Sequence, residues 1–287
     1  MSAAGARAEQ IDVAAIKARY AAAFAPSWRN RATIAASLVL MAALYVWAFV
    51  WFDVPWARVL PGCRQLLWFL AAMIPPDPGP RLVTYLGALG ETLAIALLGT
   101  LIGALFALPL GVLAARNAMP AVLVRLPIKR LFDVVRGIDT LIWALIWINV
   151  VGLGPFAGVL AIATSDFGAL GKLFAEIVES ADAKQQEGVR AAGGARLAEV
   201  RFGVLPQVLP VIAGQILYFI ESNTRSATII GVVGAGGVGL YLSEAIRVLE
   251  WKQVSFLILL ILVSVAAIDY ISSQLRAAMA GGRTVSV

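Results

Sequence analysis

Long apolar tracts, each close to the length that crosses a bilayer, limit how this chain can fold more than any other feature. Six of them are expected to be membrane spans, at about residues 32–52, 85–115, 132–151, 156–178, 208–233 and 254–275. A helix needs roughly 20 apolar residues to cross the hydrocarbon core. In the second tract, glycines and an alanine recur at three- and four-residue intervals, which lets helices approach closely in lipid. The sequence therefore predicts an all-α polytopic membrane protein with about six transmembrane helices.

Composition supports a membrane location and excludes several kinds of site. The 287 residues are 61% hydrophobic and only 14% charged, and a soluble chain with so little charge would be hard to keep in solution. Histidine is absent and Cys63 is the only cysteine, which excludes disulfides and argues against zinc, haem or iron–sulfur centres. We expect no metal site and no cofactor in this chain.

The distribution of charge predicts the topology. The net charge of +6 could suggest nucleic acid, but the basic residues gather in loops at one face, so no nucleic-acid partner is expected. They concentrate in an N-terminal arm (1–31), in the segments 116–130 and 184–201, and in a tail (276–287) that follows the transmembrane domain (32–275). Six spans put both termini on one side of the membrane. The positive-inside rule makes that side the cytoplasm.

A charged stretch, EGVRAAGGARLAEVRFGVLPQVLP, lies at residues 187–210, between the fourth and fifth apolar tracts. Its first half is predicted to be a helix with Ala191, Ala195 and Ala198 on one small-residue face. A small-residue face outside the bilayer fits the cleft of another protein. A helix that lies passively on the lipid surface is an equally good interpretation of these residues alone.

Glycine and proline are expected to divide and end this helix. Gly193 and Gly194 interrupt it, so that two helical pieces can meet at an angle. Gly203 and Pro206 are expected to end it. Prolines between residues 53 and 81 are likewise expected to break any helix there, with the short apolar piece 66–74 at the membrane interface.

The spacing of this stretch resembles the EAA loop of ABC importer permeases. In that loop Glu-Ala-Ala is followed by three residues and Gly, then by nine residues and Ile-x-Leu-Pro; Gly188, Val189 and Gly203 depart from this pattern here. The resemblance implies a cytoplasmic coupling helix that docks into a separate ATP-binding subunit. The candidate ATPase-coupling residues are Glu187, Arg190, Ala191, Gly193, Gly194, Arg196, Leu205 and Pro206.

Two glycine-containing segments look like nucleotide-binding motifs but lack the required context. GAGGVG at residues 234–239 fits G-x-G-x-x-G, which needs a preceding strand, whereas here a membrane span precedes it. Gly171-Lys172 lacks the first glycine and the Ser or Thr of a P-loop. ATP and magnesium are therefore expected in a partner subunit. The first segment is interpreted as a hinge or a close helix approach, with hinge candidates Gly234, Gly236, Gly237 and Gly239.

Charged residues inside the fifth span suggest a substrate path. Glu221 and Arg225 each cost about 2.5–3.5 kcal/mol at a helix centre, so some interaction must offset that cost. They can pair with each other at i, i+4, or Arg225 and its neighbours can form a polar track for an anion, and both can hold together. The candidate pathway residues are Glu221, Asn223, Thr224, Arg225, Ser226 and Thr228. Glu91 and Asp269 are expected to hydrogen-bond between helices.

A longer segment, residues 136–251, resembles the permease subunit of phosphonate ABC importers, a group that includes phosphite and hypophosphite transporters. The resemblance is carried by TLIWALIWINVVGLGPFAGVLA (140–161), LFAEIVESAD (173–182) and LPQVLPVIAGQILYFIESNTRSATIIGVVGAGGVGLYL (205–242). It implies a type I importer in a bacterial inner membrane. Its parts would be two permease copies, two cytoplasmic ATPases and an extracytoplasmic binding protein, working by alternating access.

Three other functions compete with this interpretation. The same machine could carry another solute, such as methionine or a quaternary amine. An intramembrane enzyme would need paired acids, a His–Ser pair or a metal constellation, and the chain has no histidine. A channel-like protein would leave the coupling loop unexplained. We therefore expect a transport subunit that is not itself an enzyme.

Overall fold

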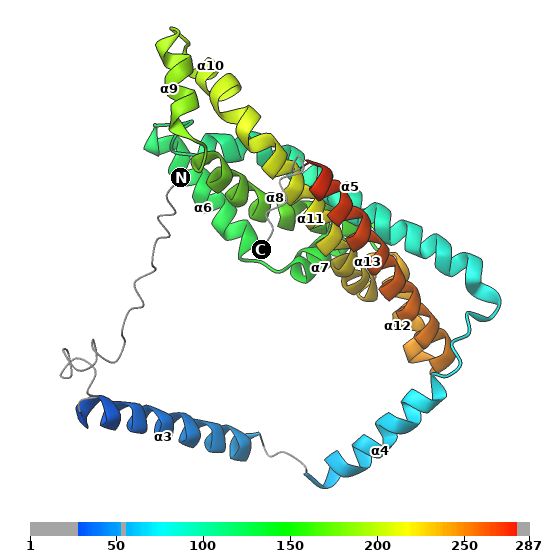
Figure 1. Ribbon diagram of the computed structural model, residues 1–287. Helices are drawn as coiled ribbons and strands as arrows, with labels where there is room; N and C mark the ends of the chain where they lie inside the picture. The colour runs from blue at the N-terminus through cyan, green and yellow to red at the C-terminus, as the bar shows by residue number, and fades with distance from the viewer. Residues whose placement is uncertain (1–27, 53–55, 280–287) are drawn as a thin grey trace, which may run out of the picture. The chain divides into compact units, whose positions relative to one another are not determined.

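The computed structural model describes residues 28–52 and 56–279, and these residues form helices and turns without a β-strand (Figure 1). The all-α prediction is confirmed, and five helices among these residues are long and apolar enough to cross a membrane, or six if one bent pair is counted as a span. The chain divides into two units, residues 1–67 and 68–287. The expected arm up to residue 27 and the tail beyond residue 279 lie outside the described residues.

The first unit contains α3 (Trp28–Trp51) and most of α4 (Trp56–Ala72). After Arg31, helix α3 is apolar, and none of its membrane-length segment is buried within the chain. Helix α4 continues through Pro61, so the expected break at that proline does not occur. Near the start of a helix a proline removes a single hydrogen bond, which the other turns can offset.

The second unit is a helical bundle. A short 3-10 turn (Gly79–Arg81) precedes its first long helix. Its helices are α5 (Leu82–Ala114), α6 (Val122–Arg136), α7 (Thr140–Val151), α8 (Pro155–Glu179), α9 (Ala183–Ala191), α10 (Arg196–Ala198), α11 (Leu205–Val232), α12 (Val238–Arg247) and α13 (Trp251–Met279), with a π-helical turn (Glu199–Val204) between α10 and α11. Figure 1 shows α9 and α10 at one end of this unit and α12 at the other.

The third expected span differs from the prediction. Residues 132–151 do not form one straight helix, because α6 and α7 meet at an angle of 87°. Asp139 causes the change of direction by capping α7, where its carboxylate accepts a hydrogen bond from the Leu141 N–H at 2.8 Å. On α6, Asp133 accepts a hydrogen bond from Lys172 of α8 at 2.6 Å. The charged side of α6 is thereby joined to α8.

Glycines hold α5 and α8 in backbone contact. A Cβ added at Gly99 would lie 2.7 Å from the Ile162 Cβ, and one at Gly103 would lie 2.9 Å from the Ala163 carbonyl oxygen. Gly111 has the same relation to Phe174, at 2.9 Å. The small residues of α5 therefore act as the sequence predicts, by letting two membrane helices approach closely.

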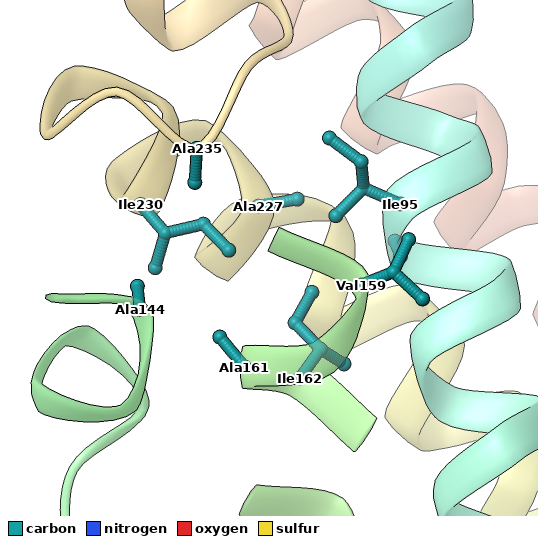
Figure 2. Close-up of a cluster of buried hydrophobic side chains, with 9 residues drawn as sticks. Ile95, Ala144, Val159, Ala161, Ile162, Ala227, Ile230 and Ala235 are labelled. Carbon is teal, nitrogen blue, oxygen red and sulfur yellow. The ribbon is translucent and has the colours of Figure 1, made fainter. Parts of the chain in front are cut away.

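A buried apolar cluster joins four of the helices (Figure 2). Its side chains come from α5, α7, α8, α11 and the loop after α11: Ile95, Ala96, Ala144, Val159, Ala161, Ile162, Ala227, Ile230 and Ala235. Most are small or β-branched, which suits helices packed at short distance. Trp143 and Trp147 of α7 pack against this cluster. The cluster fixes the bundle at the end where the glycine-rich loop lies.

Candidate coupling and substrate sites

The predicted coupling stretch, residues 187–206, lies where α8 gives way to α11. Asp182 caps α9 by accepting a hydrogen bond from the Lys184 N–H at 3.0 Å. The helix ends at Ala191, because Gly193 adopts a φ of +81° that side-chain-bearing residues rarely reach. Its N–H and that of Gly194 then bond back to carbonyls of α9, at 2.9 and 3.0 Å. The interruption at the paired glycines is thus present.

Two other expectations for this stretch are wrong. The single small-residue face does not form, because Ala191 belongs to α9 whereas Ala198 belongs to α10, beyond the glycine turn. Pro206 does not end a helix. It lies in the first turn of α11, directly after the π-helical turn, and helical backbone runs from Arg196 to Val232.

An ion pair holds α9 against the π-helical turn. Arg190 donates through Nε and Nη2 to the two carboxylate oxygens of Glu199, each at 2.9 Å, in the bidentate geometry that makes such pairs strong. Hydrogen bonding to this buried carboxylate raises the pKa of the Arg190 guanidinium above its usual value. In addition, the Gln207 amide donates to the carbonyls of Gly203 and Asp182, at 2.5 and 3.3 Å. The start of α9 is therefore fixed to the start of α11.

Further polar contacts tie the stretch to the rest of the bundle. The Arg196 guanidinium donates to the carbonyl oxygens of Asn117 and Ala118, at 3.0 and 3.4 Å, in the segment that follows α5. At the end of α8, Glu179 accepts hydrogen bonds from Lys129 of α6 at 2.8 Å and from Arg116 at 3.2 Å. These contacts join α10 to the segment after α5, and the end of α8 to α6.

Most of the candidate coupling residues are available to a partner. Exposed residues are Glu187, Arg190, Ala191, Gly193, Arg196 and Pro206, whereas Gly194 and Leu205 are half-buried. Leu197 lies among them with 81% of its surface exposed, and the sequence analysis did not single it out. A leucine within a charged segment that is predicted to lie outside the bilayer is the sequence signal that could have identified it.

The candidate pathway residues divide between two faces of α11. Asn223 points toward α5 and α8, and its amide donates to Thr100 Oγ1 at 2.8 Å and to Asp166 Oδ2 at 2.5 Å. Thr224 and Thr228 hydrogen-bond to carbonyls one turn back in their own helix, and Ser226 is half-buried. Asn223 therefore makes an interhelical contact, whereas Thr224 and Thr228 make local contacts within α11.

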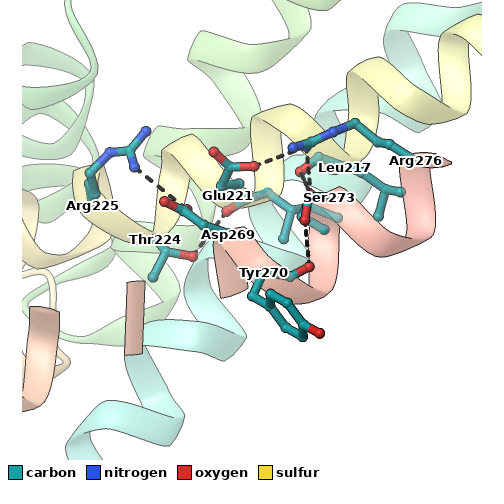
Figure 3. A network of polar contacts seen from close by, with 10 residues as sticks. Leu217, Glu221, Thr224, Arg225, Asp269, Tyr270, Ser273 and Arg276 are labelled. Atoms are coloured by element: carbon teal, nitrogen blue, oxygen red, sulfur yellow. Dashed lines mark hydrogen bonds and ion pairs between the residues drawn. The ribbon is translucent and has the colours of Figure 1, made fainter. Parts of the chain in front are cut away.

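The other face of α11 carries charge toward α13 (Figure 3). Arg276 donates to Glu221 at 2.9 Å, and Arg225 lies 3.8 Å from Asp269. The intrahelical pair of Glu221 with Arg225, which was one of two interpretations, does not form. Instead, α13 places Asp269 opposite Arg225 and Arg276 opposite Glu221, two turns apart. Within one copy of the chain, the six candidate pathway residues do not line a single track.

Sequence reasoning overlooked two buried members of the Asn223 cluster, Asp166 and Thr100. Asp166 is only 4% exposed and sits in the apolar tract of α8. A lone acid in a membrane span is the signal that pointed to Glu91 and Asp269, and it applies equally to Asp166.

The glycine-rich loop between α11 and α12 is closely packed. Glu91 of α5 accepts a hydrogen bond from the Gly237 N–H at 3.1 Å, which is the interhelical bond expected for this acid. Thr92 accepts one from the Val238 N–H at 2.8 Å. Gly239 lies so close to the Thr228 carbonyl that no side chain fits, and Gly234, Gly236 and Gly237 have positive φ. The loop follows a helix, so it lacks the strand that a dinucleotide site requires. Of the two interpretations of residues 234–239, a hinge or a close helix approach, the structure shows the close approach.

This architecture is that of the membrane-spanning subunit of an ABC importer. An inward-facing structure of the MetNI methionine ABC transporter matches with a TM-score of 0.62 and 19% identity, over 71% of this chain and 99% of that chain. An amino acid ABC transporter matches with a TM-score of 0.56 and 16% identity, over 76% and 97%. At these identities the likeness concerns the fold. Residues 107–280 match the family of binding-protein-dependent transport system inner membrane components, and the chain belongs to that family.

Closer relatives by sequence are transport permeases. A putative phosphite transport system permease protein of Stutzerimonas stutzeri is 35% identical over 250 residues, which cover 86% of this chain and 87% of the relative. The phosphite transport system permease protein of the same organism is 34% identical, over 87% and 89%. The phosphate-import permease protein of Mycolicibacterium smegmatis is 39% identical over 71% of this chain, which corresponds to 38% of that longer protein.

Proposed function

We propose that this chain is the permease subunit of an ATP-driven importer for a phosphorus oxyanion such as a phosphonate, phosphite or phosphate. The observation that carries the proposal is the similarity to two phosphite permeases over 86 and 87% of this chain. Arg225 supports it, because a guanidinium within a membrane span offers charge and several N–H donors to an oxyanion. The substrate crosses unchanged, so the subunit performs no bond chemistry.

The working assembly would contain two copies of this permease, two ATP-binding subunits and an extracytoplasmic binding protein. ATP and magnesium would bind the ATPase subunits. The exposed residues around α9 and α10 would dock on those subunits, with both chain termini on the same, cytoplasmic side of a bacterial inner membrane. The basic residues Arg116, Lys129 and Arg196 lie at the coupling end of the bundle, as the positive-inside rule requires for this orientation.

Transport would proceed by alternating access. ATP binding closes the ATPase pair and displaces α9, and the Arg190–Glu199 pair and Gln207 pass that displacement to α11. The bundle then opens outward, accepts substrate, and reverts after hydrolysis. The glycines at 234, 236, 237 and 239 would serve as the pivot between α11 and α12, with Glu91 and Thr92 anchoring the loop to α5.

A methionine or quaternary amine importer is the alternative within the same class. The likeness to the methionine transporter is one of fold at 19% identity, so it does not favour that cargo. A quaternary amine is positively charged, so Arg225 would repel it. The alternative therefore has less support than the oxyanion.

The test is uptake by the complete transporter in proteoliposomes, with the binding protein supplied on one side and ATP on the other. Methylphosphonate, phosphite, phosphate and methionine would be compared as radiolabelled substrates. We expect ATP-dependent uptake of at least one phosphorus compound and none of methionine. Uptake of methionine alone would overturn the substrate assignment and leave the importer class intact.

A further inference from the structure

The two ion pairs between α11 and α13 differ in kind (Figure 3). Glu221 and Arg276 are hydrogen-bonded at 2.9 Å, their side chains are only 12 and 33% exposed, and Ser272 accepts a second bond from Arg276 at 2.7 Å. Arg225 and Asp269 are 3.8 Å apart with side chains 48 and 45% exposed. This separation is too long for a hydrogen bond. The first pair is a closed structural contact and the second is an open one.

Asp269 is left with unused bonding capacity. Its Oδ1 atom, the one nearest Arg225, is shielded from solvent and has no hydrogen-bond partner among the described residues. A carboxylate oxygen in that position is unfavourable unless a charge stabilises it. Only the Coulombic attraction of Arg225 holds it there, so another anion can compete for that attraction.

Arg225 lies on an otherwise apolar, exposed side of α11, where lipid would not cover its charge at low cost. The exposed residues that share its side of α11 are apolar or aromatic: Val211, Tyr218, Ile229 and Val232. A charge near the middle of such a helix costs about 2.5–3.5 kcal/mol in lipid, which favours a water-accessible path or a second copy at this face. The half-exposed guanidinium has N–H groups free for a ligand, because its contact with Asp269 uses none of them in a hydrogen bond.

We propose that Asp269 is a built-in counter-ion that occupies Arg225 in the empty transporter and is displaced by the transported oxyanion. This inference rests on the proposed function, since it assigns the anion of that function to Arg225. A phosphonate or phosphite offers two oxygens to the guanidinium fork, which is a better partner than a carboxylate 3.8 Å away. When the path reopens on the other side, Asp269 returns to Arg225 and expels the anion. A transport path needs such weak, reversible binding.

Asp269→Asn tests the competition directly. It removes the competing charge with little change of shape. In the purified complete transporter without binding protein, equilibrium binding of radiolabelled phosphite, methylphosphonate and phosphate would be measured for the native chain and for this variant. We expect the variant to bind the transported anion at least about tenfold more tightly, because the repulsion between two anions close to Arg225 is gone. Slower release should reduce its uptake rate.

Two further variants make the result specific. Arg225→Gln combined with Asp269→Asn should lose the gain in affinity. Glu244→Gln is the matched control, because it removes an equally loose and exposed ion pair, that of Glu244 with Arg81 at 3.9 Å, in which no residue of α11 or α13 takes part. It should leave anion affinity unchanged. Unaltered affinity in Asp269→Asn, or a gain that survives the loss of Arg225, would overturn the inference.

Asp269→Glu covers the case in which Asp269→Asn does not assemble. It keeps the charge and extends the carboxylate by one methylene, which lets it hydrogen-bond Arg225, so anion affinity and uptake should both fall. Normal affinity and uptake in this variant would contradict the proposal. Sulfate binding separates this result from failure of the proposed function. If native protein transports no phosphorus compound but Asp269→Asn gains Arg225-dependent sulfate affinity, the counter-ion role stands while the substrate assignment fails.

Discussion

Arg190 and Glu199 form a two-bond ion pair, with both donor–acceptor distances at 2.9 Å, across the glycine turn that separates α9 from the helix leading into the membrane. The two residues are nine apart in sequence, and no helix periodicity joins them, because the turn lies between. The pair therefore converts a short exposed helix into a rigid extension of α11. Movement imposed on α9 cannot be absorbed by the turn.

Breaking this pair should uncouple the ATPase from transport. Glu199→Gln keeps the shape of the side chain but removes its charge. Coupling between distant sites is commonly worth 5–150-fold, so we expect stimulation of ATP hydrolysis by the loaded binding protein to fall roughly fivefold or more. Membrane insertion should be normal. The measurement is ATPase activity of the reconstituted complex with and without loaded binding protein.

The exposed Arg201, which stacks over the Phe202 ring at 5.4 Å, provides the control. Arg201→Gln removes a charge from the same turn without touching the pair, and should retain stimulation. The exchanged pair Arg190→Glu with Glu199→Arg should recover part of it. Full stimulation in Glu199→Gln would show that α9 transmits movement by another route.

Substitutions at Gly193 should act through the backbone. No atom lies within 4 Å of a Cβ placed there, but its φ is +81°. Asparagine tolerates this conformation and valine does not. Gly193→Val should therefore weaken co-purification of the ATPase subunits strongly, whereas Gly193→Asn should retain it. Equal losses of ATPase co-purification in both variants would indicate that any side chain at position 193 blocks docking. The conformation of the turn would then matter less.

The two α11–α13 ion pairs should respond differently to loss of the arginine. Arg276→Gln leaves the well-buried Glu221 without its counter-ion, so the complex should unfold at a temperature lower by about 5 °C or more. Arg225→Ala should lower that temperature less, because the Asp269 side chain is 45% exposed, and it should reduce uptake. Thermal unfolding in detergent and uptake in proteoliposomes would be measured on the same preparations. A normal uptake rate in Arg225→Ala would remove Arg225 from the substrate path.

Filling the α5–α8 contact should destabilise the bundle. Gly103→Val places a side chain 2.9 Å from the Asp166 Cβ and the Ala163 carbonyl, and overpacking of this kind costs about 1–3 kcal/mol. Gly87→Val on the same helix is the control, because no atom lies within 4 Å of a Cβ there. Yield of folded complex by size-exclusion chromatography should fall for the first variant only. Similar yields would mean that the helices can separate without penalty.

Local patterns in the sequence were sufficient for the helices and their close contacts. Apolar length identified the membrane helices, and the glycine spacing of α5 anticipated its contact with α8. The bend between α6 and α7 was missed, because apolar length alone does not register that Asp139 can cap a new helix. Likewise Pro206 was interpreted as a stop, although the same residue type is favoured in a helix's first turn.

Ion-pair and hydrogen-bond partners on different helices could not be predicted from the sequence. Spacing left a pair between Glu221 and Arg225 as one of two interpretations, since i, i+4 neighbours are the contacts that one helix can offer. That Arg276 and Asp269 lie opposite depends on the height at which α13 passes α11, which is set by packing. The same applies to Asp166, Asn223 and Thr100, which come from three helices and meet only in the folded bundle.

The backbone contact between α5 and α8 also determines how far a small motion can travel. No layer of side chains separates the two helices at Gly99, Gly103 and Gly111, so we expect them to move together. The 25 residues of α8 span about 38 Å and lead directly into α9. A tilt of roughly 5° at the coupling end would displace the far end by about 3 Å, from rod length alone. That leverage would let a modest stroke of a docked ATPase change the width of the proposed path at the far end.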